Sequence, residues 1–331
     1  MISNESCQLY DSFKKILKNS VEACIINLFL HILRLWRFIM SKYKRRYGDR
    51  KEGRLLRSLP AFNRFIPYIM PERSDALIYY EESFEITALD RRLRQLRVAG
   101  YKGIGILHFM IAAYIRGVSM LPGINRFCVG RRIYARDGIE IVMVVKRNMS
   151  LNATETTVKV HFEPTDTILD VYRKMNEKIE EIKTGETNNN TEELAEAFSK
   201  APRPLLRLAL WFVRVLDYFG KVPESWLEAS PFHGSMIISD LGSLRLSPVY
   251  HHIYNFGTLP VFITFGAKHH KYELNKHGQM LDNKYIDTKF VLDERICYGH
   301  YYSQFLQAYR YMFQHPEILE NPPTRIIEDV Y

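Results

Sequence analysis

Residues 104–121, IGILHFMIAAYIRGVSML, constrain the fold more than any other stretch of this chain. Their apolar side chains fall on nearly every face of a helix, so other elements must cover that helix on all sides. Pro122 ends the helix, because proline cannot donate the next helical hydrogen bond. A fold built in layers around this helix is therefore required. A chain of 331 residues, 47% of them apolar, is large enough to build it.

Strands and helices alternate along the rest of the chain. Alternating or continuous apolar runs predict strands, and apolar residues at steps of three and four predict helices. The predicted strands are residues 139–147, 156–164, 234–240, 259–267 and 285–293. Helices are predicted after Ile86, after Asp166 and after Gly299. This order predicts an α/β (α+β) two-layer sandwich, a mixed β-sheet covered by helices, in one domain over residues 59–331.

The positive charge of the chain lies near its N-terminus. The net charge is +9, and residues 34–57 contribute +8 of it, from ten Lys and Arg against two acidic residues. We expect residues 1–58 to form an amphipathic, basic arm, and we expect no nucleic acid partner, since the remaining chain is nearly neutral. The arm is either a plain solvated segment or, through residues 22–57, a contact with an anionic membrane surface. A natural start at Met40 would remove its apolar half.

Two further patterns bear on the compartment. The four cysteines lie far apart with no CxxC pair, which predicts neither a disulfide framework nor a metal site. We see no signal peptide and no apolar run long enough to span a bilayer. These patterns predict a cytoplasmic protein. If the basic arm binds a membrane, the protein is attached peripherally to its surface.

A polar stretch, TGETNNNTEE, introduces a helical insertion at about residues 185–230. Within it, residues 203–220 read RPLLRLALWFVRVLDYFG, with polar side chains on one narrow stripe only. Such a helix must bury most of its surface against the core, a partner subunit or lipid. We expect the core or a partner subunit.

Four segments in this order resemble a known family. They read YYEESFEITALDRRLRQLR, IAAYIRGVSMLPGINRF, SMIISDLGSLRLSPVYHHIYNFGTLPVFITFGA and LDERICYGHYYSQFLQAYRYMFQHPEIL. Together they resemble the catalytic domain of the acyltransferase subunit of 2-oxo-acid dehydrogenase complexes and, more distantly, chloramphenicol acetyltransferase. The resemblance implies a chloramphenicol acetyltransferase-like fold, coenzyme A or acyl-CoA as the cofactor, and a homotrimer with its sites between subunits. No lipoyl domain is visible.

The resemblance assigns three site residues, two of which depart from the family pattern. Ser239 matches the serine whose hydroxyl stabilises the oxyanion, Glu294 stands in place of the catalytic histidine, and Tyr298 in place of an aspartate. Glutamate has a pKa about two units below that of histidine and is a weaker base toward a thiol. Two functions stay open: an acyltransferase acting on a coenzyme A thioester and an unknown acceptor, or a catalytically inactive oligomeric binding protein, a pseudoenzyme.

The surroundings of Glu294 decide how good a base it is. Contact with Arg295 would lower its pKa further, whereas burial would raise it. Four histidines are weaker candidates for the base, because each is more often structural or on the surface: His233, His251, His252 and His300. Cys297 has no base beside it, and we expect it to pack in the core.

Overall fold

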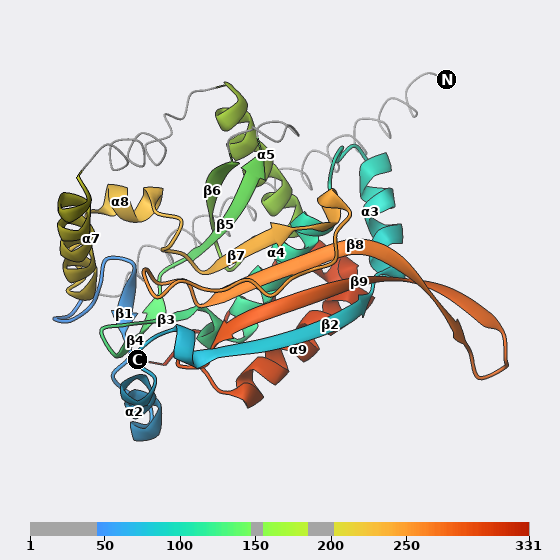
Figure 1. Ribbon diagram of the computed structural model, residues 1–331. Helices are drawn as coiled ribbons and strands as arrows, with labels where there is room; N and C mark the ends of the chain where they lie inside the picture. Colours follow the sequence, from blue (N-terminus) through green and yellow to red (C-terminus); the bar gives the residue numbers. More distant parts are fainter. Residues whose placement is uncertain (1–44, 147–154, 185–201, 331) are drawn as a thin grey trace, which may run out of the picture. The chain divides into compact units, whose positions relative to one another are not determined.

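A mixed six-stranded sheet forms the centre of the fold (Figure 1). The computed structural model describes residues 45–146, 155–184 and 202–330, and its strand order is β2-β9-β8-β7-β5-β6. The strands are Leu77–Glu85 (β2), Ile139–Lys146 (β5), Glu155–Phe162 (β6), Met236–Asp240 (β7), Val261–Leu274 (β8) and Met280–Asp293 (β9). β7 is parallel to β5 and β8, and the other neighbours are antiparallel. The mixed sheet is confirmed.

Four helices pack on one face of this sheet (Figure 1). They are α3 (Thr87–Val98), α4 (Ile106–Met120), α5 (Ile168–Thr184) and α9 (Gly299–Gln314). α4 contacts both α5 and α9, and nearly all its side chains are buried. The two-layer sandwich and the buried helix are therefore confirmed.

Aromatic side chains fill the space between the sheet and the helices. Phe84 of β2 stacks on Phe313 of α9, with ring centroids 4.4 Å apart. The Tyr309 hydroxyl donates a hydrogen bond of 2.8 Å to the carbonyl oxygen of Met110 in α4. This bond satisfies a polar group that would be costly to bury alone. It also joins the two central helices.

A small second sheet, of order β1-β4-β3, lies beside the main one. Its strands are Gly53–Leu55 (β1), Arg126–Val129 (β3) and Arg132–Arg136 (β4), and α2 (Ala61–Ile69) follows β1 in the chain. A Cβ on Gly53 would lie 2.4 Å from the carbonyl oxygen of Ala135, so only glycine allows this approach. Residues 53–55 of the expected arm therefore belong to the folded unit.

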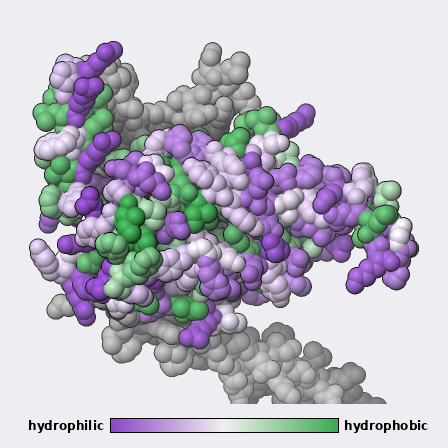
Figure 2. Space-filling model, turned by 60° about the horizontal axis from the view of Figure 1, so that its bottom comes forward, coloured by the Kyte–Doolittle hydropathy of each residue, from purple (hydrophilic) through white to green (hydrophobic). Residues whose placement is uncertain are grey.

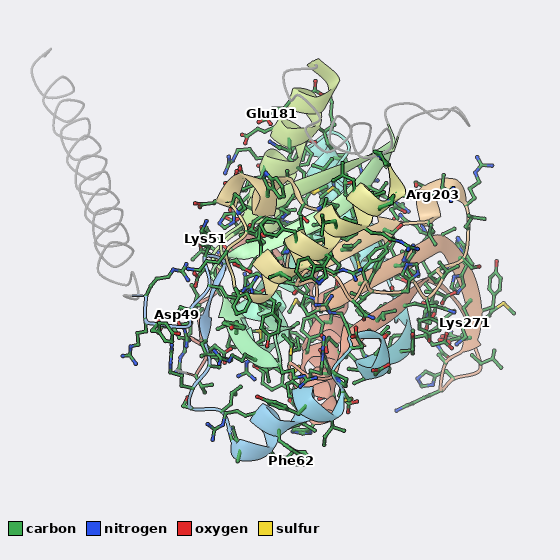
Figure 3. The ribbon with its side chains drawn as sticks, turned by 60° about the vertical axis from the view of Figure 1, so that its left-hand side comes forward. Asp49, Lys51, Phe62, Glu181, Arg203 and Lys271 are labelled. Carbon is green, nitrogen blue, oxygen red and sulfur yellow. The ribbon has the colours of Figure 1, made fainter. Side chains whose placement is uncertain are left out.

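Short 3₁₀ helices complete the chain, at Ser74–Ala76, Pro122–Asn125, Gly242–Leu244 and Pro316–Glu320. The outer ends of β8 and β9 extend past the helical layer as a hairpin, on which Lys271 lies (Figure 3). On the sheet face opposite the helices, Ile253 and Leu259 pack on Ile237 and Phe262. The segment after β7 thus covers part of that face.

Of the two contacts expected for the 203–220 helix, the core or a partner subunit, burial in the core is wrong. The helix forms α7 (Arg203–Tyr218), and Trp211 and Phe212 are 60% and 54% exposed. Asp217 is the buried residue of α7, held by Arg50 at 2.6 Å. Figure 2 shows hydrophobic surface at the left of the molecule, where α7 and α8 (Glu224–Ala229) lie. Contact with a partner subunit remains the open alternative.

Within the described residues, no helix has the length and apolar character needed to cross a membrane.

Candidate functional site

The signature segment begins where β9 ends, on a buried carboxylate. Asp293 is fully buried and accepts hydrogen bonds from the Arg295 guanidinium at 2.9 and 2.8 Å. Arg73 adds a third bond, of 3.3 Å, from the segment that precedes β2. Charge-assisted bonds of this kind are stronger than neutral ones. They hold the turn after β9 in one conformation.

Glu294, at the position of the family's histidine, is half-buried beside this network. Its backbone N–H donates to the carbonyl oxygen of Ala76 at 2.8 Å. Its carboxylate has neither a hydrogen bond nor an ion pair with any residue that the structure describes. Arg295 forms no ion pair with it, because Arg295 is bonded to Asp293. Glu294 is thus a positioned carboxylate without a partner in the described part of the chain.

Tyr298, at the position of the family's aspartate, faces α2. It is 39% exposed, and its hydroxyl donates a hydrogen bond to the side-chain oxygen of Asn63. Its ring lies 6.5 Å from that of Phe62, which is on the outer side of α2 (Figure 3). Burial raises the pKa of Tyr298, so the phenol stays protonated at neutral pH. The residue joins the start of α9 to α2.

Ser239 is half-buried on β7 and lies on the sheet face opposite the helices. Its register partner is Thr264, which in turn pairs with Lys289 of β9. Glu294 comes five residues after Lys289, and at about 3.3 Å per residue this is roughly 17 Å along the strands. The two strand spacings add to this separation. One chain therefore does not bring Ser239 and Glu294 together.

The buried His233 belongs to a structural network. Its Nδ1 lies 2.7 Å from the Ser230 hydroxyl, and its Nε2 lies 3.5 Å from Asp217, which also binds Arg50. Burial disfavours the Asp217 carboxylate, but His233 and Arg50 hold its pKa below the usual value. This network fastens α7 to the body of the protein. Sequence reasoning gave no sign of it.

None of the other candidate residues, all of them described, forms a hydrogen bond or an ion pair with the Glu294 carboxylate. His251 stacks on Phe262 at 4.5 Å, in the segment over the sheet, next to the exposed His252. His300 is exposed at the start of α9. Cys297 is buried, and burial raises its thiol pKa to about 12. Its position agrees with the expected packing role.

A cavity of about 430 Å³ lies next to the signature segment. Arg73 and Arg295 line it, together with Cys128 on β3 and Asn255. Glu294 is not among its lining residues. Among the described residues, no group of His, Cys, Asp and Glu side chains could hold a metal ion.

Similar folds occur in acyltransferases of known structure. The cubic core of the pyruvate dehydrogenase multienzyme complex matches 85% of this chain and 96% of its own, with 12% identity and a TM-score of 0.51. Dihydrolipoamide acetyltransferase of Azotobacter vinelandii gives the same coverage and TM-score at 11% identity. That enzyme was studied for the role of a serine, a histidine and an asparagine in its mechanism.

Chloramphenicol acetyltransferase matches 76% of this chain and 94% of its own, with 9% identity and a TM-score of 0.44. No family model and no curated protein sequence matches the chain. The two dehydrogenase-complex structures establish the fold. The chain has the fold of these acetyltransferase cores, as its four ordered segments predict.

Proposed function

We propose that this chain, which shares its fold with dihydrolipoamide acetyltransferase, moves an acyl group from a coenzyme A thioester to a thiol or hydroxyl acceptor. The observation that carries the proposal is Glu294. It is a half-buried carboxylate with no partner among the described residues, on a turn fixed by Asp293, Arg295 and Arg73. A positioned base of this kind contributes about 10²–10⁴ in rate.

In the proposed reaction, the Glu294 carboxylate takes the acceptor's proton as the acceptor oxygen or sulfur attacks the thioester carbonyl. The Ser239 hydroxyl donates a hydrogen bond to the oxyanion that forms. When the oxyanion collapses, the carbon–sulfur bond breaks. The departing thiolate then takes the proton from Glu294, which yields the acylated acceptor and free coenzyme A. Proximity supplies a further part of the acceleration.

The proposed site lies between two copies of the chain, because Ser239 and Glu294 of one copy are far apart. Coenzyme A, the homotrimer and this shared site are parts of the proposal. Symmetric assembly would bring Ser239 of one copy to Glu294 of the next at every interface. The known oligomeric cores with this fold support the idea, since one of them is a cubic assembly.

Mixed oligomers test this proposal. Ser239→Ala and Glu294→Gln should each lower acyl-CoA turnover by about 10² or more. When the two variants are unfolded together and refolded, about a quarter of the interfaces should combine an intact Ser239 with an intact Glu294. Turnover should then rise above that of either variant alone. Glu85→Gln, an exposed carboxylate on β2, is the matched control and should keep wild-type turnover.

Wild-type turnover that survives Glu294→Gln would rule out this base, and recovery that fails on mixing would rule out the shared site.

A second function, a non-catalytic oligomeric binding protein, is favoured by one observation. Tyr298 is bonded to Asn63 and Arg295 to Asp293, so these two side chains are held in structural contacts and do not assist Glu294. In that case all variants bind coenzyme A and show the same background hydrolysis as wild type.

Attachment to an anionic membrane surface through residues 22–57 also stays a proposal, since residues 22–44 lie outside the described residues. The basic cluster should give binding to anionic vesicles that weakens as salt rises. A chain that begins at Gly48 should lose this binding. Equal binding by the full and the shortened chain would contradict the proposal.

A further inference from the structure

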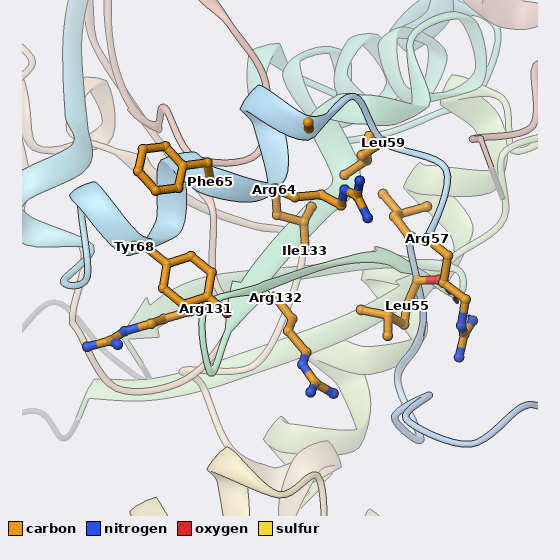
Figure 4. Close-up of a pocket in the computed structure, with 11 residues that line it drawn as sticks. Leu55, Arg57, Leu59, Arg64, Phe65, Tyr68, Arg131, Arg132 and Ile133 are labelled. Carbon is orange, nitrogen blue, oxygen red and sulfur yellow. Dashed lines mark hydrogen bonds between the residues drawn. The ribbon is translucent and has the colours of Figure 1, made fainter.

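A second cavity, of about 450 Å³, lies between α2 and the edge of the small sheet, and four arginines surround it. They are Arg57 after β1, Arg64 on α2, and Arg131 and Arg132 at the β3–β4 turn. Figure 4 shows Arg64 reaching from α2 toward the middle of the cavity, with Arg57 and Arg132 at its sides. We call this cavity the arginine pocket.

None of the described residues that line the arginine pocket is acidic. Arg57 is held by Asp49 at 3.1 Å, outside the lining. Among the residues that the structure describes, no carboxylate forms an ion pair with Arg64, Arg131 or Arg132. Guanidinium groups stay charged at every physiological pH, so Arg64, Arg131 and Arg132 line this cavity with three positive charges that no described carboxylate pairs. Their guanidinium groups point in different directions (Figure 4). An anion would relieve the repulsion between them.

The remaining lining of the arginine pocket is apolar or aromatic. Leu59 and Ile133 are buried at 5% and 4% exposure, whereas the rings of Phe65 and Tyr68 are 55% and 56% exposed. Arg131 lies 5.6 Å above the Tyr68 ring. Ligand pockets combine such apolar walls with a few charged groups that fix the ligand's orientation. The walls can therefore take the uncharged part of a ligand.

We propose that the arginine pocket binds an organic phosphate, a phosphate ester whose other part is apolar or aromatic. Arginine matches phosphate oxygens with two parallel hydrogen bonds. Several arginines suit the double charge of a phosphate better than the single charge of a carboxylate. The ester comes either from a soluble nucleotide-like compound or from a phospholipid headgroup. The proposal does not depend on acyl transfer, because Glu294 and Ser239 are not part of this pocket.

Calorimetric titration with adenosine 3′,5′-bisphosphate and flotation with phosphatidate vesicles test the two sources. Wild type is compared with Arg64→Gln/Arg132→Gln, which removes two charges from the pocket. Each lost charge-assisted bond should weaken binding about tenfold or more. The matched control is Arg91→Gln/Arg325→Gln, which removes the same charge from two exposed sites elsewhere. Circular dichroism of each variant checks that it is folded.

If the affinity for the bisphosphate falls at least tenfold in the pocket variant and not in the control, the proposal is supported and the ligand is a soluble phosphate ester. The same pattern with vesicles alone supports it with a lipid source. Equal losses in the two double variants would overturn it, because binding would then follow net charge. Absence of binding to both probes by wild type would overturn it as well. The exposed arginines can be replaced without touching the core, so the variants should fold.

Discussion

His108, in the first turn of α4, is a buried group that should make stability depend on pH. Its Nδ1 accepts a hydrogen bond of 3.1 Å from the Gly105 N–H, and its Nε2 is buried with no hydrogen-bond partner among the described residues. Burial lowers its pKa to about 4, below the ordinary value of 6.5. Between these two pH values, the unfolded chain binds a proton that the folded chain does not. Folding stability should therefore fall as the pH drops through this window.

Urea unfolding at pH 7.5 and pH 4.5 measures this effect. The loss assignable to His108 should be at most about 3 kcal/mol, by the usual conversion of pKa units to free energy. His108→Gln keeps an acceptor for the Gly105 N–H but cannot take up the proton. Its stability should fall less between the two pH values than that of wild type. Carboxylates titrate in both proteins and cancel in the comparison, so equal losses would contradict the assignment.

The sequence offers single candidate site residues but not the side chains that they contact. The order of the four segments indicates Ser239 and Glu294. The sequence places no base beside Cys297, and its buried position agrees with the packing role expected from that. The bond from Tyr298 to Asn63 joins residues 235 apart, and no local pattern signals it. The same holds for Asp293, whose second partner, Arg73, lies 220 residues earlier. Long-range polar pairs depend on the tertiary fold, which periodicity does not encode.

At the scale of elements, apolar periodicity predicted what is buried but not what covers it. α4 is apolar on nearly all faces, and the sheet and helices of the same chain cover it, as expected. α7 has a similar composition, yet its apolar side chains are largely exposed in the described chain. The requirement for burial holds for both helices. Only the structure shows that α7 finds no cover among residues 48–146, 155–184 and 202–330.

The strands also differ from their predicted lengths for a physical reason. β8 runs seven residues past residue 267, through KHHKYEL. β9 begins five residues before residue 285, with MLDNK. These segments are mostly polar and are exposed on both faces, so they carry no alternation that would predict a strand. Their mutual hydrogen bonds form the hairpin instead. Phe290 and Ile263, deeper in the same strands, lie in the core.

At the scale of the whole molecule, two observations point to assembly of several copies. α7 exposes a large apolar surface, and Ser239 and Glu294 of one copy lie too far apart to act together. Monomers rarely expose apolar patches of this kind. A symmetric oligomer explains both observations, since it covers apolar surface and brings residues of different copies together.

Light scattering at micromolar concentration should therefore give a mass near three times 39.1 kDa. If α7 lies in the contact, Leu208→Ser/Trp211→Ser should shift the mass toward 39.1 kDa, because burial of large apolar side chains drives such contacts. Tyr272→Ser/Leu274→Ser removes equally exposed apolar side chains from the β8–β9 hairpin, and this control should stay trimeric. A trimer unaffected by the α7 variant would leave assembly intact and place the contact elsewhere. A wild-type monomer would rule out both the trimer and the shared site, and Glu294 would then need a partner other than Ser239.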